Sequence, residues 1–361
     1  MSEVIKKIKS VTENVYKRIM KKEAPELEMP LRDLSNVDYN EKEGFFDIKG
    51  KTKSRTLTAS TIKTFAQTLK MMGLSKKLVE TKDIATKRDA YYQSKGAWGA
   101  ASFEEQEESD AIMDDIEAML GFNRERIGFI PDEDGSAVAG ELVIVDRDPE
   151  TGEKIEIDCT KMGTGGYSVP ATVEQFTFKT NAKFILAIET AGMFQRLNYH
   201  KFWRKHNCII ISLKGVPSRA TRRFIRKLSD EKNIPVYVFT DGDPYGYFSI
   251  YRTLKVGSGN AAHINKYFCV PNAKFIGVTP QDIIDYKLPT HPLKDVDIKK
   301  IKDVIKNDPF CKHSKEWQKA LSQMAQMGKR VEQQAFSSHS LNFVIDTYLP
   351  EKLKNQKTWL P

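Results

Sequence analysis

Short apolar runs alternate with longer amphipathic stretches in the second half of the chain. The stretches 191–205 and 218–232 have the apolar spacing of helices, whereas the runs between them are continuous and rich in β-branched and aromatic residues. Continuous apolar runs of this length are typical of strands that a parallel sheet buries on both faces. The pattern therefore predicts a Rossmann-like sheet with right-handed crossover helices. Its expected strands are residues 184–188, 208–212, 236–240 and 274–278.

The first half of the chain has mainly helical periodicity. Apolar residues recur at helical spacing in residues 1–22 among many lysines and arginines, and we expect this helix to pack on its own domain or on a partner protein. Residues 61–72, 85–92 and 112–120 are further expected helices, the last ending at a C-cap Gly121. Asp134-Gly135 then separates two strand-like runs, as in a β-hairpin. Helices followed by a hairpin are consistent with a winged helix-turn-helix domain.

Three acidic residues directly follow the predicted strands. Glu189 comes after the strand 184–188, and Asp241 and Asp243 come after the strand 236–240. Ligands of open parallel sheets gather beyond the carboxyl ends of the strands, so these carboxylates converge if the two strands are neighbours. Mg²⁺ needs only two or three carboxylates because it keeps several waters. Asp-Gly-Asp-Pro is also a turn sequence, but the position of all three acids at strand ends favours a magnesium site.

The helix expected at 218–232 presents a row of arginines. The segment from Leu213 to Lys227 contains no acidic residue. A solvated charged face is the usual explanation of such a row, but a face without acids near a carboxylate site is better suited to a DNA backbone. The expected DNA-binding residues are Lys214, Arg219, Arg222, Arg223 and Arg226.

Charge and composition narrow the class of protein. The 361 residues include 57 lysines and arginines against 48 aspartates and glutamates, a formal charge of +9, which favours polyanionic partners. The four cysteines are scattered without a C-x-x-C pair, which is typical of a reducing compartment. The apolar runs are too short to cross a bilayer and no signal-peptide pattern is visible, so we expect a cytoplasmic, nucleoid-associated protein without membrane contact.

A pair of tyrosines ends the sequence Lys87-Arg88-Asp89-Ala90-Tyr91-Tyr92. A tyrosine nucleophile needs a nearby cation or metal, because its ordinary pKa is about 10. Arg88 precedes Tyr92 by four residues and would share its side of a helix. The residues alone do not separate a nucleophilic tyrosine from one that packs in the core.

The tyrosine sequence resembles the corresponding motif of the topoisomerase VI A-subunit family, the archaeal type IIB topoisomerases, and of their meiotic double-strand-break relatives. The segments 184–189 and 241–246 are similar to the Toprim metal motifs of that family, and 214–222 is similar to the segment between them. The tail segments 332–336 and 348–353 resemble the archaeal proteins in particular. The likeness covers roughly residues 60–361 and does not depend on one motif.

The resemblance implies an α/β protein in which a winged-helix (catabolite-activator-like) domain precedes a Rossmann-like Toprim domain. We expect an N-terminal arm and partner-docking region at 1–65, a winged-helix DNA-binding domain with the catalytic tyrosine at 66–175, and a metal-binding Toprim domain with a C-terminal helical extension at 176–361. The implied assembly is a homodimer that binds double-stranded DNA and joins an ATPase B subunit in an A2B2 heterotetramer.

The chemistry that the resemblance implies is transient DNA cleavage. Tyr92, the second of the paired aromatics, would become linked to a 5′ phosphate, and Arg88 would stabilise charge on that phosphate. Glu189, Asp241 and Asp243 would hold Mg²⁺ in the opposite protomer, while ATP would be bound by the ATPase partner and not by this chain. Another Toprim nuclease or phosphotransferase, or a DNA-binding scaffold without catalysis, is the alternative that the sequence leaves open.

Overall fold

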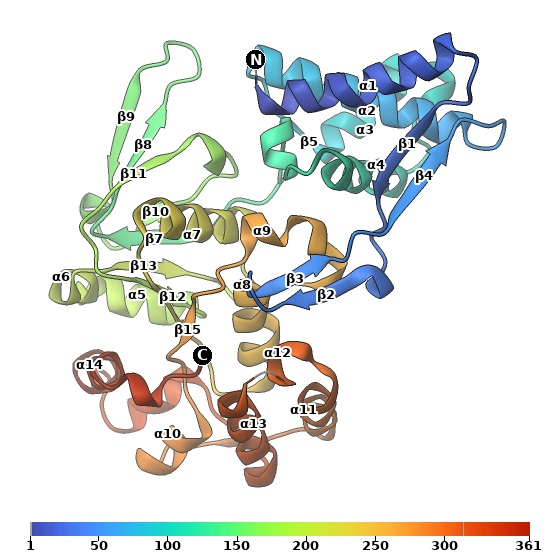
Figure 1. Ribbon diagram of the computed structural model, residues 1–361. Coiled ribbons are helices and arrows are strands. Elements are labelled where there is room, and N and C mark those ends of the chain that lie inside the picture. Colours follow the sequence, from blue (N-terminus) through green and yellow to red (C-terminus); the bar gives the residue numbers. More distant parts are fainter. Residues whose placement is uncertain (1, 313) are drawn as a thin grey trace. The chain divides into compact units, whose positions relative to one another are not determined.

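The computed structural model describes residues 2–312 and 314–361, and its chain divides into two compact units (Figure 1). The first unit is formed by residues up to 38, 46–133 and 258–267, and the second by 39–45, 134–257 and 268–361. The division after Glu133 differs from the boundary at 175 that the sequence analysis expected.

The first unit is mainly helical. Apolar residues from all four of its long helices share one core with β1, including Val4, Phe65, Ala90 and Ile116. The predicted helices are confirmed, and Gly121 ends the last of them in the left-handed conformation with φ 72°. The elements are α1 (Glu3–Met20), α2 (Ile62–Thr81), α3 (Lys87–Ala97) and α4 (Gln106–Leu120), with antiparallel β1 (Glu26–Pro30) and β4 (Thr52–Thr56) and parallel β5 (Ala85–Thr86) and β6 (Phe129–Ile130). Three further elements, β2 (Val37–Asn40), β3 (Phe45–Ile48) and α9 (Asn265–Phe268), include residues of both units.

The hairpin predicted at Asp134-Gly135 is wrong. The strand before it, β6, pairs with β5, whereas the strand after it, β7 (Ala137–Gly140), pairs antiparallel with β10 (Tyr167–Ser168) and β13 (Ile209–Ser212). A local turn signal does not specify a strand's partner, and β7 buries Val138 and Ala139 completely or nearly so between β10 and β13 in the larger sheet. A hairpin does form further on, where β8 (Val143–Arg147) pairs with β9 (Lys154–Asp158) and with β11 (Thr177–Lys179).

The second unit contains the predicted Rossmann-like sheet. Its strand order is β10-β7-β13-β12-β14-β15, and the last four strands run parallel: β13, β12 (Ile185–Ile188), β14 (Val236–Phe239) and β15 (Lys274–Phe275). The neighbouring positions of β12 and β14, on which the expected carboxylate cluster depends, are confirmed. Figure 1 shows α5 (Ala191–Tyr199) and α7 (Arg219–Lys232) on opposite sides of this sheet.

Successive side chains of β12 point to opposite faces of the sheet and are buried on each face. Leu186 and Ile188 pack in a core with Phe194 of α5, while Ile185 and Ala187 are fully buried and point the other way. A strand that is apolar at every position therefore needs cover on both faces, which explains the continuous apolar runs of the sequence.

The remaining helices of the second unit lie between the strands of the sheet or follow it in sequence. The helix Lys315–Met327 ends at the C-cap Gly328, and the chain then pairs as a strand. The elements are α6 (Phe202–His206), α8 (Arg252–Val256), α10 (Pro280–Asp285), α11 (Asp295–Asn307), α12 (Pro309–Lys312), α13 (Lys315–Met327), α14 (Leu349–Lys354), β16 (His291–Pro292) and β17 (Lys329–Arg330).

All four cysteines are buried free thiols. Among the described residues, no helix combines the length and the apolar character that a membrane crossing requires.

Candidate active site

The pairing of β12 with β14 brings the first two predicted carboxylates together. Ile188 lies opposite Phe239, and the backbone N–H of Glu189 continues the ladder by donating to the Phe239 carbonyl at 3.0 Å. The Glu189 side chain then turns toward the next strand end, where its Oε2 accepts a hydrogen bond of 2.8 Å from the Asp241 backbone N–H. The pairing of the two strands and the hydrogen bond from the Asp241 backbone therefore hold Glu189 and Asp241 beside each other.

Each of the three carboxylates accepts a hydrogen bond from a backbone N–H. Besides the bond to Glu189, Asp241 Oδ1 accepts one from Gln333 at 2.8 Å and Asp243 Oδ1 accepts one from Gly246 at 2.7 Å. Gly246 has no room for a side chain, since a Cβ there would lie 2.7 Å from the Asp241 carbonyl oxygen and 3.2 Å from Glu189 Oε2. The turn after β14 thus wraps tightly around the acids.

Burial raises the pKa of all three acids. Burial, reinforced by the neighbouring Asp241 charge, raises the pKa of Glu189 to about 8. Burial also raises the pKa of Asp241 to about 6, although the Gln333 hydrogen bond opposes this shift. Burial raises the pKa of Asp243 as well. The cluster therefore carries negative charge that the surrounding protein only partly compensates.

A segment from the C-terminal region lies alongside the acidic turn. Val331 forms an isolated antiparallel bridge with Gly242, so that in this register Arg330 is opposite Asp243 and Glu332 is opposite Asp241. The Arg330 charge lowers the pKa of both aspartates, and the Glu332 charge raises the pKa of Asp241. Sequence reasoning missed Arg330 and Glu332 as parts of the site, because they lie about 90 residues beyond the turn and no local pattern connects them to it.

The donor set suits a hard divalent cation. Three carboxylates offer only oxygen ligands, which Mg²⁺ prefers, and their raised pKa values reflect a burial of negative charge that a cation would offset. As the side chains stand, however, no three His, Cys, Asp or Glu residues within 2–312 and 314–361 form a group that could hold a metal ion. The carboxylates are turned toward backbone N–H groups instead, so the assignment of Glu189, Asp241 and Asp243 as metal ligands stays a prediction.

The tyrosine motif forms the start of α3 in the first unit. Thr86 and Asp89 make a reciprocal capping box at its N-terminus, and Ala90 is fully buried in the core. Tyr91 is half-buried and donates from its hydroxyl to the Glu104 carbonyl at 3.1 Å. Tyr92 is 59% exposed, and Arg88, one turn earlier, is exposed as well. The structure thus gives the two tyrosines different environments, with Tyr92 accessible to a large substrate.

The acidic run at 104–110 packs against this helix. Glu104 pairs with Lys63 of α2, and Asp110 pairs with Lys87 at the start of α3. The Glu104 carbonyl also accepts from Lys95 at 2.9 Å, in addition to Tyr91. The run that the sequence left without a role therefore connects α3 to its neighbours.

The predicted arginine face on α7 is less open than expected. Arg223 makes a two-bonded ion pair with Glu174, and Arg226 pairs with Asp230 and also donates to the Cys269 carbonyl. The expectation of a face without acids is therefore wrong for these two arginines, since Glu174 reaches Arg223 from an earlier part of the sequence and Asp230, one turn later on α7, pairs with Arg226. Arg219 and Arg222 lie over the Phe268 ring, whereas Lys214, in the loop before α7, is exposed. Their contacts with DNA stay a prediction.

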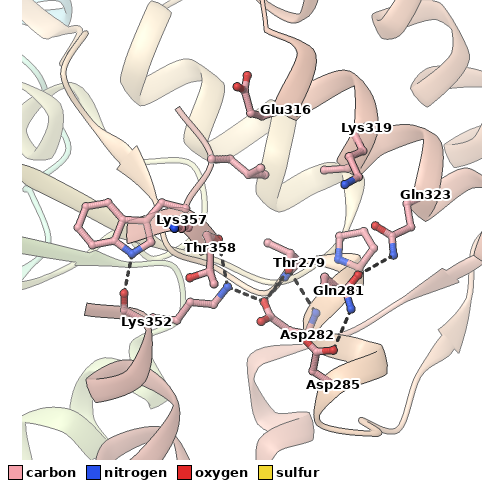
Figure 2. Close-up of a pocket in the computed structure, with 14 residues that line it drawn as sticks. Thr279, Gln281, Asp282, Asp285, Glu316, Lys319, Gln323, Lys352, Lys357 and Thr358 are labelled. Carbon is pink, nitrogen blue, oxygen red and sulfur yellow. Dashed lines mark hydrogen bonds and ion pairs between the residues drawn. The ribbon is translucent and has the colours of Figure 1, made fainter. Parts of the chain in front are cut away.

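A separate cavity of about 280 Å³ in the second unit contains none of these residues (Figure 2). There the Lys352 ammonium, which is almost fully buried, pairs with Asp282 at 2.9 Å, and Asp282 also accepts from Thr279. Tyr348 donates to the same carboxylate at 3.1 Å. Figure 2 shows this ion pair joining the end of the chain to α10, which indicates a structural role.

A Rossmann-like sheet with acids at the ends of two adjacent parallel strands indicates a Toprim-type domain within the second unit. In agreement with this, residues 184–353 match the Toprim domain of the topoisomerase 6 A subunit and Spo11. Residues 132–182 match the all-beta domain of the DNA topoisomerase VI alpha subunit, and 63–128 match a family described as type IIB DNA topoisomerase.

Whole-length relatives give the same result. The chain is 56% identical to the A subunit of type 2 DNA topoisomerase 6 from Methanocaldococcus jannaschii, over 98% of this chain and 95% of that protein. It is 38% identical to the protein of the same name from Methanothermobacter thermautotrophicus, over 97% of each chain. The protein of that name from Pyrococcus abyssi is 37% identical, over 98% of this chain and 94% of its own. The chain belongs to the topoisomerase VI A-subunit family, and the family resemblance found in the sequence is confirmed.

Replacement of Glu189 by Gln should change how stability depends on pH. Because folding raises the pKa of Glu189 from its ordinary 4.5 to about 8, the folded state binds more protons than the unfolded state between these values. Stability in the absence of divalent cations is therefore lost as the pH rises through this window. Glu189→Gln should raise the free energy of unfolding at pH 8.5 by on the order of a few kcal/mol, and by almost nothing at pH 4.5.

Urea unfolding in EDTA at the two pH values measures this difference, and Glu150→Gln, at an exposed acid between β8 and β9, is the matched control. An equal gain at both pH values would show that the carboxylate of Glu189 is not under electrostatic stress.

Proposed function

We propose that this chain is the DNA-cleaving and rejoining subunit of an ATP-dependent type IIB topoisomerase. It would make a transient double-strand break through which a second duplex passes, and so relax or decatenate DNA. The observation that carries the proposal is the presence, in one member of this family, of an exposed tyrosine on a capped helix and of three acids at adjacent strand ends. A DNA-binding scaffold would need neither.

The reaction is a transesterification that needs no high-energy cofactor at the cleavage step. The Tyr92 oxygen attacks a backbone phosphorus as the phenol loses its proton, and the bond from phosphorus to the 3′ oxygen breaks. The 3′ oxygen gains a proton and leaves as a hydroxyl, while the 5′ phosphate stays bound to Tyr92. Reversal of these changes rejoins the strand. Arg88, exposed one turn before Tyr92, would stabilise negative charge on the phosphate.

Glu189, Asp241 and Asp243 are the residues that would hold Mg²⁺. When bound, the ion would polarise the phosphate or anchor its nonbridging oxygens. The protein's own contribution is to place the three carboxylates through backbone N–H groups, so that their positions depend on the main chain and not on flexible side chains.

The arrangement of domains and protomers is also part of the proposal. We assign a winged-helix DNA-binding domain to the region that carries Tyr92, supported by its helices α2, α3 and α4. Tyr92 and the acids belong to different compact units, which is compatible with a homodimer in which the tyrosine of one protomer works with the acids of the other.

An ATPase partner would complete an A2B2 assembly. The last turns of α1 expose three apolar residues at one-turn spacing, Tyr16, Ile19 and Met20, which are 62%, 52% and 65% exposed. We call these three residues the α1 patch. It supports the proposal that residues 1–65 form the docking region for the ATPase partner, which would also be the protein that binds ATP.

Replacement of Tyr92 by Phe should abolish covalent attachment to DNA. The purified chain is incubated with a candidate ATPase partner, supercoiled plasmid, Mg²⁺ and nucleotide, and the protein linked to 5′ ends is measured after denaturation. Tyr92→Phe should leave no linked protein, whereas Tyr91→Phe, the matched control, should retain linkage because it removes only the hydrogen bond to Glu104. Cleavage by the wild-type protein without attachment would contradict the proposed function.

Lys214 should contribute to DNA affinity through phosphate contact. Lys214→Gln should weaken binding to duplexes of any sequence and lower the slope of log affinity against log salt by about one. Fluorescence anisotropy across a salt series measures both quantities. Lys299→Gln on α11 removes an equally exposed lysine and serves as the control. If the two variants behave alike, the contact assigned to Lys214 is wrong.

The α1 patch should be needed for binding the ATPase partner. Ile19→Glu places a charge in the patch and should lower the affinity for the purified partner by about tenfold or more, as expected for an apolar anchor of an interface. Ile84→Glu alters an isoleucine of similar exposure elsewhere in the first unit and should leave affinity unchanged. Calorimetric titration of the two proteins distinguishes these outcomes, and an unchanged affinity for Ile19→Glu would exclude the patch.

A further inference from the structure

Gln333 is a fully buried polar residue next to the carboxylate site. Its backbone N–H donates to Asp241 Oδ1 at 2.8 Å. Its side-chain amide donates to the Phe239 carbonyl at 2.8 Å, and its amide oxygen accepts a bond of 3.1 Å from the Thr190 hydroxyl. The donor and the acceptor of the amide are therefore both engaged.

These bonds join the ends of the two strands that carry the acids. Thr190 directly follows Glu189 at the end of β12, and Phe239 is the last residue of β14, two residues before Asp241. One residue from a distant part of the chain thus contacts both strand ends and one carboxylate. Val331, two residues before Gln333, forms two backbone hydrogen bonds of 2.8 and 3.1 Å with Gly242, which lies between Asp241 and Asp243. The segment that carries Gln333 is therefore fixed to the turn after β14 at more than one point.

The chemistry of the position requires an amide. Nearby side chains in the segment, Val331 and Phe336, are apolar and fully buried, so a polar group here costs free energy unless it is hydrogen-bonded. A methionine would fill a similar volume but would bond neither Thr190 nor Phe239. A satisfied amide at this place therefore does more than fill the core: it sets a distance between two strand ends.

We propose that Gln333 is a positioning residue of the carboxylate site, which fixes the end of β12 relative to the turn after β14 and thereby limits how the carboxylates can close around a divalent cation. The inference rests on the proposed function, since it takes Glu189 and Asp241 as the cation ligands. Residues that orient ligands from outside the ligand set alter metal affinity by about 10- to 100-fold when they are replaced.

The test measures metal binding directly and not only activity. Mn²⁺ is titrated into the purified chain and the free ion is followed by electron paramagnetic resonance. Gln333→Met should lower Mn²⁺ affinity by about tenfold. DNA cleavage with the ATPase partner should then need more Mg²⁺ and should recover at high Mg²⁺. Gln334→Met, the same change at the exposed neighbouring residue, should alter neither.

A second variant covers the case in which Gln333→Met does not fold. Thr190→Val removes only the hydroxyl, which also caps α5, and should reduce Mn²⁺ affinity in the same direction by a smaller factor. Circular dichroism establishes which variants are folded. Folded Gln333→Met with wild-type affinity overturns the inference, as does folded Thr190→Val with wild-type affinity when Gln333→Met is unfolded.

Asp241→Asn separates this inference from the proposed function. If Asp241→Asn loses Mn²⁺ but folded Gln333→Met keeps it, the carboxylates bind metal and only the role of Gln333 is wrong. If Asp241→Asn binds Mn²⁺ as the wild type does, the metal site itself is wrong, and with it the premise of the inference.

Discussion

The parallel pairing of β12 with β14 is the constraint on which the candidate site depends. Its ladder runs from Ile185 opposite Val236 to Ile188 opposite Phe239, and the next residues are the acids. A slip of one residue would turn every side chain of β12 to the other face of the sheet and would carry Glu189 with it. Because the side chains of β12 are fully buried on both faces, the apolar core fixes the register and the register fixes the acids.

The same pairing of strands places like-charged carboxylates close together. Burial and mutual repulsion raise the pKa of Glu189 and Asp241, and Arg330 offsets only part of the negative charge. Backbone N–H groups hold the carboxylates in spite of this repulsion. Such a cluster lowers stability at neutral pH unless a cation joins it. A fold that keeps such a cluster carries it at a cost in stability, which supports the proposal that the acids bind a cation.

The sequence predicted the strands, their parallel orientation and the acids at their ends, because each of these follows from local apolar patterning and one topological rule. It did not predict which strands are neighbours. Prediction from the sequence failed where interacting residues lie far apart along the chain. The expected hairpin at Asp134-Gly135 is absent because β7 pairs with β13, whose residues lie some 70 positions away. The ion pair of Arg223 with Glu174 and the bonds of Gln333 likewise join parts of the chain that no local pattern connects.

The tyrosine motif shows why a nucleophile was hard to select from sequence and easier to select from structure. Asp89 is part of a helix cap and Ala90 fills the core, so these two residues of the motif stabilise α3. Tyr91 is tied by its hydroxyl to the segment that follows the helix. A phenol that must react with a DNA backbone has to be exposed, yet its helix has to be rigid. Capping, core packing and the Tyr91 bond provide the rigidity, and Tyr92 alone of the pair has the exposure.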